Sequence, residues 1–225
     1  MTNRAGLLSK GGVALFRRAL YWLAAAGLIH LSCATFDGSY SSTKTAGRET
    51  ASSGFQPVYV YSDHGSFKNH FYPTGLMGDH EDIVYHDGYS QDTVSGNSCI
   101  AVIYKAKAEQ HHGWVGMYWQ NPAYNWGYKD GGLNLSGASR LTFWARGDKG
   151  TEKIEKFCVG GTKGSYSDSC FASIGPFYLT KQWKQYEIDL SGKDLSSVIG
   201  GFCWSINAQN NPQGALFYLD EISYE

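Results

Sequence analysis

The 225-residue chain is poor in charge, with 17% charged residues and a formal net charge of −1. A nucleic-acid binder needs clustered Lys and Arg side chains to contact phosphates, so this balance argues against one. No stretch sustains the apolar spacing of a helix, which argues against an α/β fold. The chain also lacks the G-x-S-x-G, H-E-x-x-H and phosphate-loop motifs of common enzyme classes.

Glycine and aromatic residues are abundant, with 28 Gly, 16 Tyr, 11 Phe and 7 Trp. This composition suits short strands joined by many turns better than it suits helices. Large rings also fill the cores of β-sandwiches, so a single aromatic residue does not by itself indicate a binding site. The length favours one folded domain of about 150–200 residues, which is enough to bury a hydrophobic core.

Residues 1–33 have the organisation of an export signal. Basic residues precede an apolar stretch over 19–31, which is too short to predict a transmembrane helix. The segment ends at Leu31-Ser32-Cys33, which resembles a bacterial lipoprotein signal, although His30 stands where that pattern usually has Leu, Val or Ile. We therefore expect lipidation of the Cys33 thiol and an exported protein, anchored to a membrane at the cell surface or outer membrane. Plain secretion and an uncleaved anchor are the alternatives.

Residues 34–56 consist mostly of Ser, Thr and Gly and contain almost no aliphatic residues. Such a segment cannot bury enough apolar surface to order itself. We predict a flexible tether that holds a folded domain, residues 57–225, away from the membrane.

Four cysteines remain besides Cys33, and export permits them to form disulfides in any of three connectivities. Cys158 and Cys170 flank a turn rich in Gly and Ser, so a local bridge between them is one option. Cys99 and Cys203 lie in apolar segments, where they can pair or stay buried as thiols. No Cys or His spacing indicates a zinc site.

From residue 57 onward, short apolar or alternating segments are separated by turn residues. On the alternating segments, the pattern points Trp119 and Trp204 inward and Trp114, Tyr118 and Trp144 outward. We expect about eight or nine antiparallel strands in an all-β sandwich or jelly roll. The expected strands are 57–62, 99–105, 113–120, 140–147, 153–160, 183–190, 201–207 and 215–225.

A recognisable pattern runs through LTFWARGDKG, LTKQWKQYEIDLSGKDLS, GGFCWSIN and FYLDEISYE. These strings resemble the galactose-binding-domain-like jelly rolls, which include the family 11 type of carbohydrate-binding module of bacterial polysaccharide-degrading enzymes. The resemblance covers residues 57–225 and is strongest over 139–225. It implies a jelly-roll fold and a carbohydrate ligand, although members of this superfamily also bind lipids or peptides.

The same resemblance implies a structural calcium ion, which these jelly rolls often hold with oxygens of the first and last strands. Asp220 matches the acidic position of the last strand, and Asp63, at the end of the first, would be its partner. Calcium takes about six to eight oxygen ligands. A second acidic group, Asp79, Glu81 and Asp82, is expected to be solvated loop charge.

A sugar site needs an exposed ring to stack on the apolar sugar face, with polar groups to bond the hydroxyls. Segment 114–126 holds both kinds of side chain, and the strand at 140–147 adds two more on its outward face. If the two strands share a sheet, these residues form one patch. The alternative is that a loop covers Tyr118 and Trp144 and that Arg146 pairs with a carboxylate. The expected sugar-binding residues are Trp114, Tyr118, Gln120, Asn125, Trp126, Trp144 and Arg146.

The sequence thus favours a monomeric, non-catalytic surface protein that binds a polysaccharide such as β-glucan. A carbohydrate-active enzyme is the first alternative, but Glu187 and Asp189 share one exposed face and do not flank a bond, as hydrolysis requires. His64, His70 and Tyr72 could support a lyase, yet no feature sets their geometry. The second alternative is an adhesin or structural lipoprotein that binds a protein partner.

Overall fold

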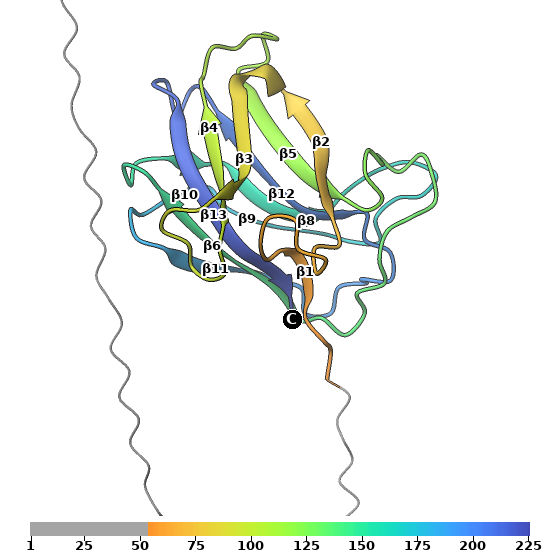
Figure 1. The fold of residues 1–225 in the computed structure, drawn as a ribbon. Coiled ribbons are helices and arrows are strands. Elements are labelled where there is room, and N and C mark those ends of the chain that lie inside the picture. The colour runs from red at the N-terminus through yellow and green to blue at the C-terminus, as the bar shows by residue number, and fades with distance from the viewer. Residues whose placement is uncertain (1–53) are drawn as a thin grey trace, which may run out of the picture. The chain divides into compact units, whose positions relative to one another are not determined.

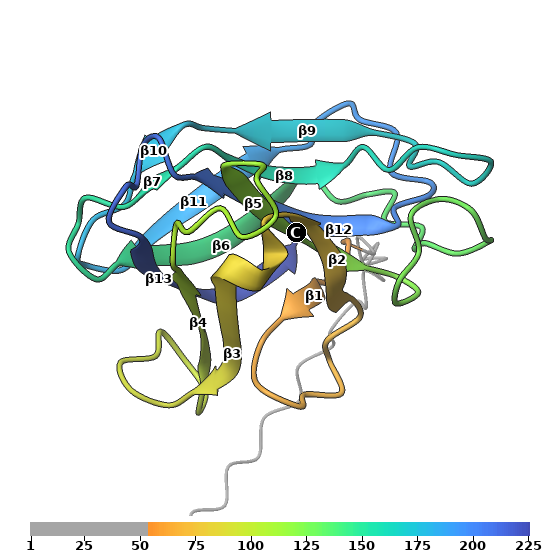
Figure 2. The same cartoon turned by 90° about the horizontal axis from the view of Figure 1, so that it is seen from above.

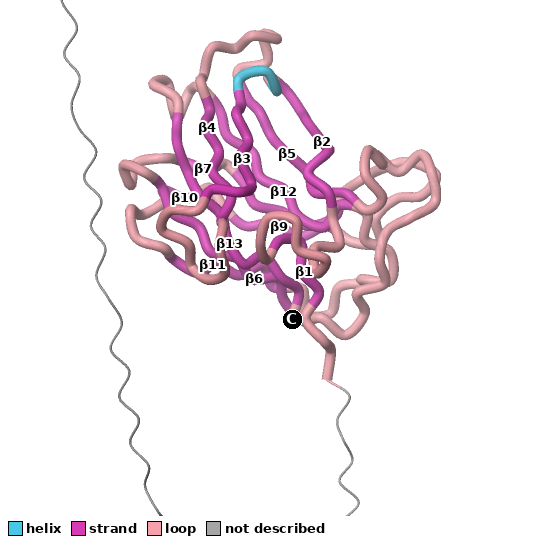
Figure 3. Tube along the Cα trace, viewed as in Figure 1, coloured by secondary structure: helices cyan, strands magenta, loops and turns pink. Residues whose placement is uncertain are grey.

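The structure is a computed structural model, and it describes residues 54–225. The predicted export signal with Cys33, and residues 34–53 of the predicted tether, lie outside the described residues. Nearly all regular structure in 54–225 is β-strand, and the one helix there is a short 3₁₀ turn (Figure 3). No helix in this part of the chain is long and apolar enough to cross a membrane.

Two antiparallel sheets form a jelly-roll β-sandwich, which confirms the predicted fold class (Figures 1 and 2). The elements are β1 (Val58–Tyr61), β2 (Tyr72–Gly78), η1 (His80–Asp82), β3 (Ile83–Tyr89), β4 (Cys99–Tyr104), β5 (Trp114–Gln120), β6 (Arg140–Gly147), β7 (Lys153–Ile154), β8 (Lys156–Gly160), β9 (Phe171–Ile174), β10 (Phe177–Tyr178), β11 (Lys184–Asp189), β12 (Gly200–Asn207) and β13 (Ala215–Tyr224). Every segment expected to be a strand contains strand structure, but 153–160 is divided into β7 and β8, which belong to different sheets. The sequence pattern does not predict β2, β3, β9 or β10.

The six-stranded sheet runs in the order β11-β6-β13-β4-β3, with β1 paired to β13. The five-stranded sheet runs in the order β2-β5-β12-β8-β9. β7 and β10 form a separate two-stranded pair. Strands that are far apart in sequence thus become neighbours, and β12 lies between β5 and β8. By contrast β5 and β6, which follow one another along the chain, belong to different sheets.

The core is built from the inward residues of the alternating strands. Trp119 of β5 and Trp204 of β12 are fully buried, as predicted. Phe143 of β6 contacts Phe157 of β8 and Phe202 of β12, with ring centroids 4.6 and 5.1 Å apart. These ring pairs join the two sheets, and such aromatic contacts add about 0.5–1.5 kcal/mol each beyond area burial. Because side chains alternate along a strand, the residues between these inward ones lie on the outer faces, where ligands have access.

The acidic group around η1 is not solvated as the sequence suggested. Asp79 and Asp82 are fully buried, and of the three acids only Glu81 is exposed. The Asp79 carboxylate accepts three backbone N–H bonds of 2.6–2.9 Å from the loop at 105–113. Burial acts to raise the pKa of Asp79, but these bonds outweigh it and hold the pKa below its ordinary value. Asp82 accepts a further bond from the same loop, so the two carboxylates anchor the connection from β4 to β5.

Candidate functional site

The outer face of the five-stranded sheet carries the exposed rings of segment 114–126. The alternation that buries Val115 and Trp119 turns Trp114 and Tyr118 outward on β5. Trp114 exposes 38% of its surface, and Trp126, in the loop after β5, exposes 39%. The Tyr118 ring lies edge-on to Trp126, with 5.7 Å between the centroids. Three rings therefore follow one another along this face.

The Tyr118 side chain lies flat over the outer face of the sheet and does not project into solvent. Its hydroxyl donates a hydrogen bond of 3.0 Å to the Gly160 carbonyl and contacts Cys158 Sγ at 3.6 Å, so the side chain reaches from β5 over β12 to β8. The ring crosses β12 at Gly200, where a Cβ atom would lie 2.9 Å from a ring carbon. Burial raises the pKa of Tyr118 to about 12, so its hydroxyl stays neutral at physiological pH.

Cys158 of β8 and Cys203 of β12 form a disulfide beside Tyr118. They stand opposite one another in the antiparallel register, with Cα atoms 4.9 Å apart. The local bridge from Cys158 to Cys170 and a bridge from Cys99 to Cys203 are therefore both wrong, because strand pairing joins β8 to β12. Cys99 and Cys170 are free within the described residues, and burial raises their pKa values to about 12 and about 11.

Tyr118, Trp114 and the disulfide line a groove of about 300 Å³ on this outer face. Met77 of β2 lines it on one side and Lys156 of β8 on the other, with Ser205 of β12 between them. The groove thus crosses four neighbouring strands.

A glycine on β5 keeps the floor of this groove open. A Cβ atom at Gly116 would lie 2.7 Å from Met77 Cε and 2.8 Å from the Trp204 carbonyl oxygen. Both distances are shorter than real Cβ contacts allow, so any larger residue would displace Met77 or the strand itself.

A second hollow, of about 510 Å³, adjoins the groove, because Trp114 and Ser205 line both. Glu155 and Gln209 are among its other lining residues. The Glu155 carboxylate accepts a hydrogen bond from the side-chain amide of Asn210. Trp114 therefore borders a hydroxyl and a charged group in the groove, and amide and charged groups in the second hollow. This combination suits a ligand with an apolar face and polar edges.

Gln120 and Asn125, expected to bond a sugar, are buried and satisfied within the protein. Gln120 Nε2 donates to the Asn125 carbonyl at 2.8 Å, and Gln120 Oε1 accepts from the Thr74 hydroxyl at 2.9 Å. The Asn125 side chain bonds backbone groups of its own loop. The two amides therefore position the loop that carries Trp126, and their polar atoms do not face the groove.

The loop at 121–134 lies beside the loop at 161–170, at the right of both Figure 1 and Figure 2. The Tyr166 N–H donates a hydrogen bond of 2.9 Å to the Gly127 carbonyl, which ties the loops together. Tyr124, Tyr128 and Tyr166 are exposed on them. These two loops, one of which carries Trp126, thus expose further tyrosine rings.

Trp144 and Arg146 lie on the outer face of the other sheet, so the single patch expected from the sequence is wrong. The Arg146 side chain is only 11% exposed and forms a 3.0 Å ion pair with Asp92. Its guanidinium stacks 3.8 Å from the ring centroid of Tyr218, and the Trp183 ring lies at 5.2 Å. The ion pair with Asp92 confirms the part of the alternative in which Arg146 pairs with a carboxylate.

Asp63 and Asp220 do not fit a shared calcium site. The Asp220 carboxylate accepts N–H bonds of 2.8 Å from Val94 and 2.9 Å from Glu221, and Asp63 accepts one from Asn97. N–H groups thus already use part of the accepting capacity of each carboxylate, and calcium takes about six to eight oxygen ligands. Residues 54–225 contain no cluster of three His, Cys, Asp or Glu side chains able to hold a metal. The two carboxylates instead fasten the loop between β3 and β4.

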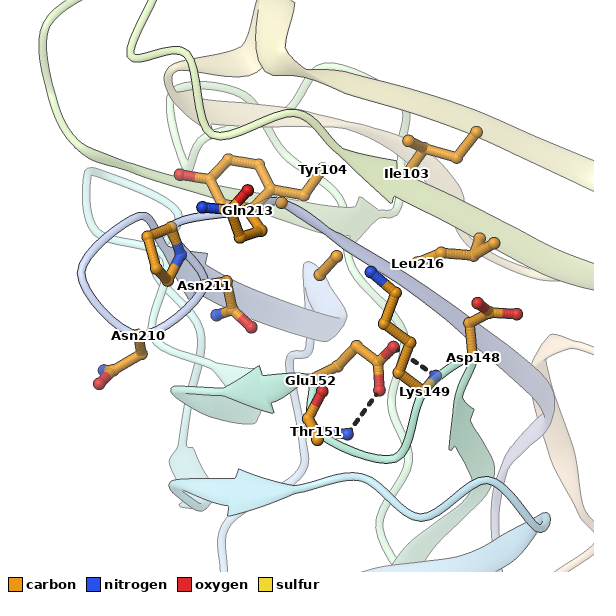
Figure 4. Close-up of a pocket in the computed structure, with 13 residues that line it drawn as sticks. Ile103, Tyr104, Asp148, Lys149, Thr151, Glu152, Asn210, Asn211, Gln213 and Leu216 are labelled. Carbon is orange, nitrogen blue, oxygen red and sulfur yellow. Dashed lines mark hydrogen bonds between the residues drawn. The ribbon is translucent and has the colours of Figure 1, made fainter.

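A larger hollow of about 570 Å³ lies between the β6–β7 and β12–β13 turns, as Figure 4 shows. The aromatic residue of its lining is Tyr104, whose ring is buried. The Glu152 carboxylate accepts backbone N–H bonds from Lys149 and Thr151 at 2.7 and 3.0 Å, which closes the turn. Without an exposed ring, this hollow offers no stacking platform for a sugar.

The groove lacks the carboxylate pair of a glycoside hydrolase, which would stand about 5–10 Å apart. Glu155 is the only carboxylate among the residues that line the groove and the second hollow, all of them in the described part of the chain. Glu187 and Asp189 are exposed on β11, at the edge of the other sheet. His64, in the loop after β1, bonds Asp87 of β3 at 3.0 Å, and neither residue lines the groove.

The sequence matches no family model and no curated protein. Two crystal structures of family 30 carbohydrate-binding modules match the fold with TM-scores of 0.50 and 0.51 and 15% identity, over 75% and 76% of this chain and 87% and 98% of theirs. A family 11 module of a Clostridium thermocellum cellulase matches 67% of this chain and 82% of its own, with 14% identity and a TM-score of 0.40. The family 30 structures confirm the resemblance to carbohydrate-binding jelly rolls at the level of the fold.

Proposed function

We propose that this protein is a non-catalytic carbohydrate-binding protein. Its ligand is a polysaccharide or oligosaccharide that lies along the outer face of the five-stranded sheet. The row of Trp126, Tyr118 and Trp114 beside the groove carries the proposal, because these rings match the apolar faces of successive sugar units. The shared fold with family 30 carbohydrate-binding modules supports it.

The arrangement favours binding over catalysis. Trp114 and Trp126 are each about two-fifths exposed, so each ring offers a surface for a sugar while its buried part stays packed against its neighbours. The polar groups around Trp114 can bond hydroxyls, and each such bond is worth about 0.5–1.5 kcal/mol net. A single carboxylate in the adjoining hollow cannot supply both the acid and the base of hydrolysis.

Affinity electrophoresis in gels that contain soluble polysaccharides, with pull-down on insoluble ones, tests this proposal. We expect retardation by at least one polysaccharide, and we expect Trp126→Ala to reduce it. Phe67→Ala is the matched control, since Phe67 is 91% exposed and lies outside the candidate face. Absence of binding across a broad glycan array would reject the proposal. Reducing-sugar release would favour an enzyme instead, and capture of a protein that free sugar does not displace would favour an adhesin.

We also propose that the protein is exported and held on a membrane by a lipid on Cys33. The basic and apolar segments before Cys33 support this, and so does the Cys158–Cys203 disulfide, because disulfides persist in oxidising compartments. Metabolic labelling with a radioactive fatty acid is expected to mark the wild type and not Cys33→Ser. An unlabelled wild type in the culture medium would indicate plain secretion.

A further inference from the structure

Lys156 is the only charged residue among those that line the groove. The outward positions of the five strands carry apolar, small and neutral polar side chains, and within the described residues Lys156 is their only charged residue. Lys156 is exposed and lines the groove. It takes part in none of the ion pairs found in residues 54–225.

Lys156 stands next to the groups that would hold a sugar. It is directly opposite Ser205 in the register of β8 with β12, and Ser205 is opposite Gly116 of β5. Neighbouring strands lie about 4.8 Å apart, so the ammonium, the Ser205 hydroxyl and the Trp114 ring border the same small space. All three line one groove and can contact one ligand.

The carboxylate nearest to Lys156 in sequence does not enter this groove. Glu155 lines the second hollow, beyond Trp114 and Ser205, and its carboxylate bonds Asn210. The groove therefore presents a positive charge, and the adjoining hollow presents a negative one.

We infer that the groove binds an acidic polysaccharide, and that the Lys156 ammonium binds the carboxylate of a uronic acid unit whose ring stacks on Trp114. This inference rests on the proposed function, and it replaces a neutral β-glucan with a polyuronate as the ligand class. A carboxylate gives the ammonium a charge-assisted hydrogen bond, which is stronger than a bond to a sugar hydroxyl. Such a bond favours the acidic polymer by about tenfold or more.

Isothermal titration calorimetry on the full-length protein, with matched pairs of polymers, tests the inference. The probes are polygalacturonate, alginate and glucuronoxylan, each beside its carboxyl-reduced form, with a neutral β-glucan as a further comparison. Lys156→Met keeps the apolar stem of the side chain and removes the charge, and Lys156→Arg restores the charge. Lys153→Met is the control, because the Lys153 ammonium lies over the Tyr178 ring, outside the groove.

We expect at least one polyuronate to bind about tenfold or more tightly than its reduced form. Lys156→Met should abolish this preference, Lys156→Arg should retain it, and added salt should weaken it. Equal binding of acidic and reduced polymers that still depends on Trp114, or a preference that survives in Lys156→Met, would overturn the inference and leave the proposed function intact. Absence of binding to every polymer would overturn both.

Discussion

Replacement of Trp114 by Ala is expected to weaken polysaccharide binding by roughly 30-fold. A Trp side chain presents up to about 250 Å² of surface, and Trp114 keeps 38% of its surface exposed. A stacked sugar that covers roughly 80 Å² of this area gains about 2 kcal/mol at about 25 cal/mol per Å². That free energy corresponds to a factor of about 30 in Kd at 25 °C.

Calorimetric titration of the polysaccharide found by affinity electrophoresis measures this Kd. Trp114→Phe should recover part of the affinity, since a smaller ring still stacks. Trp144→Ala, on the outer face of the other sheet, should leave Kd unchanged, provided that circular dichroism shows every variant to be folded. The reasoning is refuted if Trp114→Ala and Trp126→Ala both bind as tightly as the wild type, and still more clearly if Trp144→Ala alone loses binding.

Three further predictions concern stability. The two cysteines of the disulfide are 45 residues apart, so its reduction should lower the free energy of unfolding by about 4 kcal/mol on chain-entropy grounds. A urea midpoint that reductant leaves unchanged would contradict this. As a control, a Cys158→Ser/Cys203→Ser double variant should show no response to reductant. Burial raises the pKa of Asp220 to about 6, above its ordinary value of 3.8, so the folded state binds this proton more tightly than the unfolded state does. Its contribution is full below about pH 4 and is lost as pH rises through 6, and solvent screening limits the loss to at most roughly 3 kcal/mol. The wild type should therefore lose stability over this range relative to Asp220→Asn, and parallel pH profiles would disprove the assignment. Removal of calcium with EDTA should leave Tm unchanged, because Asp63 and Asp220 already bond N–H groups, and a fall in Tm that added calcium reverses would show a calcium site.

The strands and the inward residues could be predicted from the sequence because alternation is a local property. The pattern in β5 and β12 places Trp119 and Trp204 in the core without any knowledge of which strands are neighbours. Prediction failed for β2, where Pro73, Gly75 and Gly78 interrupt the pattern of a strand.

The candidate site could be predicted only in part, because sheet membership depends on contacts between distant segments. Trp114, Tyr118 and Trp126 come from one stretch of chain, and they stay together in the fold. Trp144 comes from the next strand, which joins the other sheet. The outward position of Lys156 is predictable from the sequence, because alternation from buried Phe157 turns it outward.

The burial of polar side chains could not be predicted from the sequence, for a related reason. Gln120 and Asn125 have the chemistry of sugar-binding amides, and Asp79 and Asp82 have that of solvated acids. In the folded chain each of these side chains bonds backbone or side-chain groups of its own or neighbouring loops. A sequence does not show which loop returns to cover a polar side chain, so burial of this kind requires the structure.

The glycines beneath the aromatic face have a consequence for how the protein can evolve. Gly116 and Gly200 leave the space into which Met77 and the Tyr118 ring settle. A single added methyl group at Gly200 would meet only side-chain atoms, chiefly the Tyr118 ring. One at Gly116 would meet Met77 and also the backbone carbonyl of Trp204. The shape of the groove can thus be altered at Gly200 by a side-chain shift alone, whereas Gly116 is fixed by the backbone of the neighbouring strand.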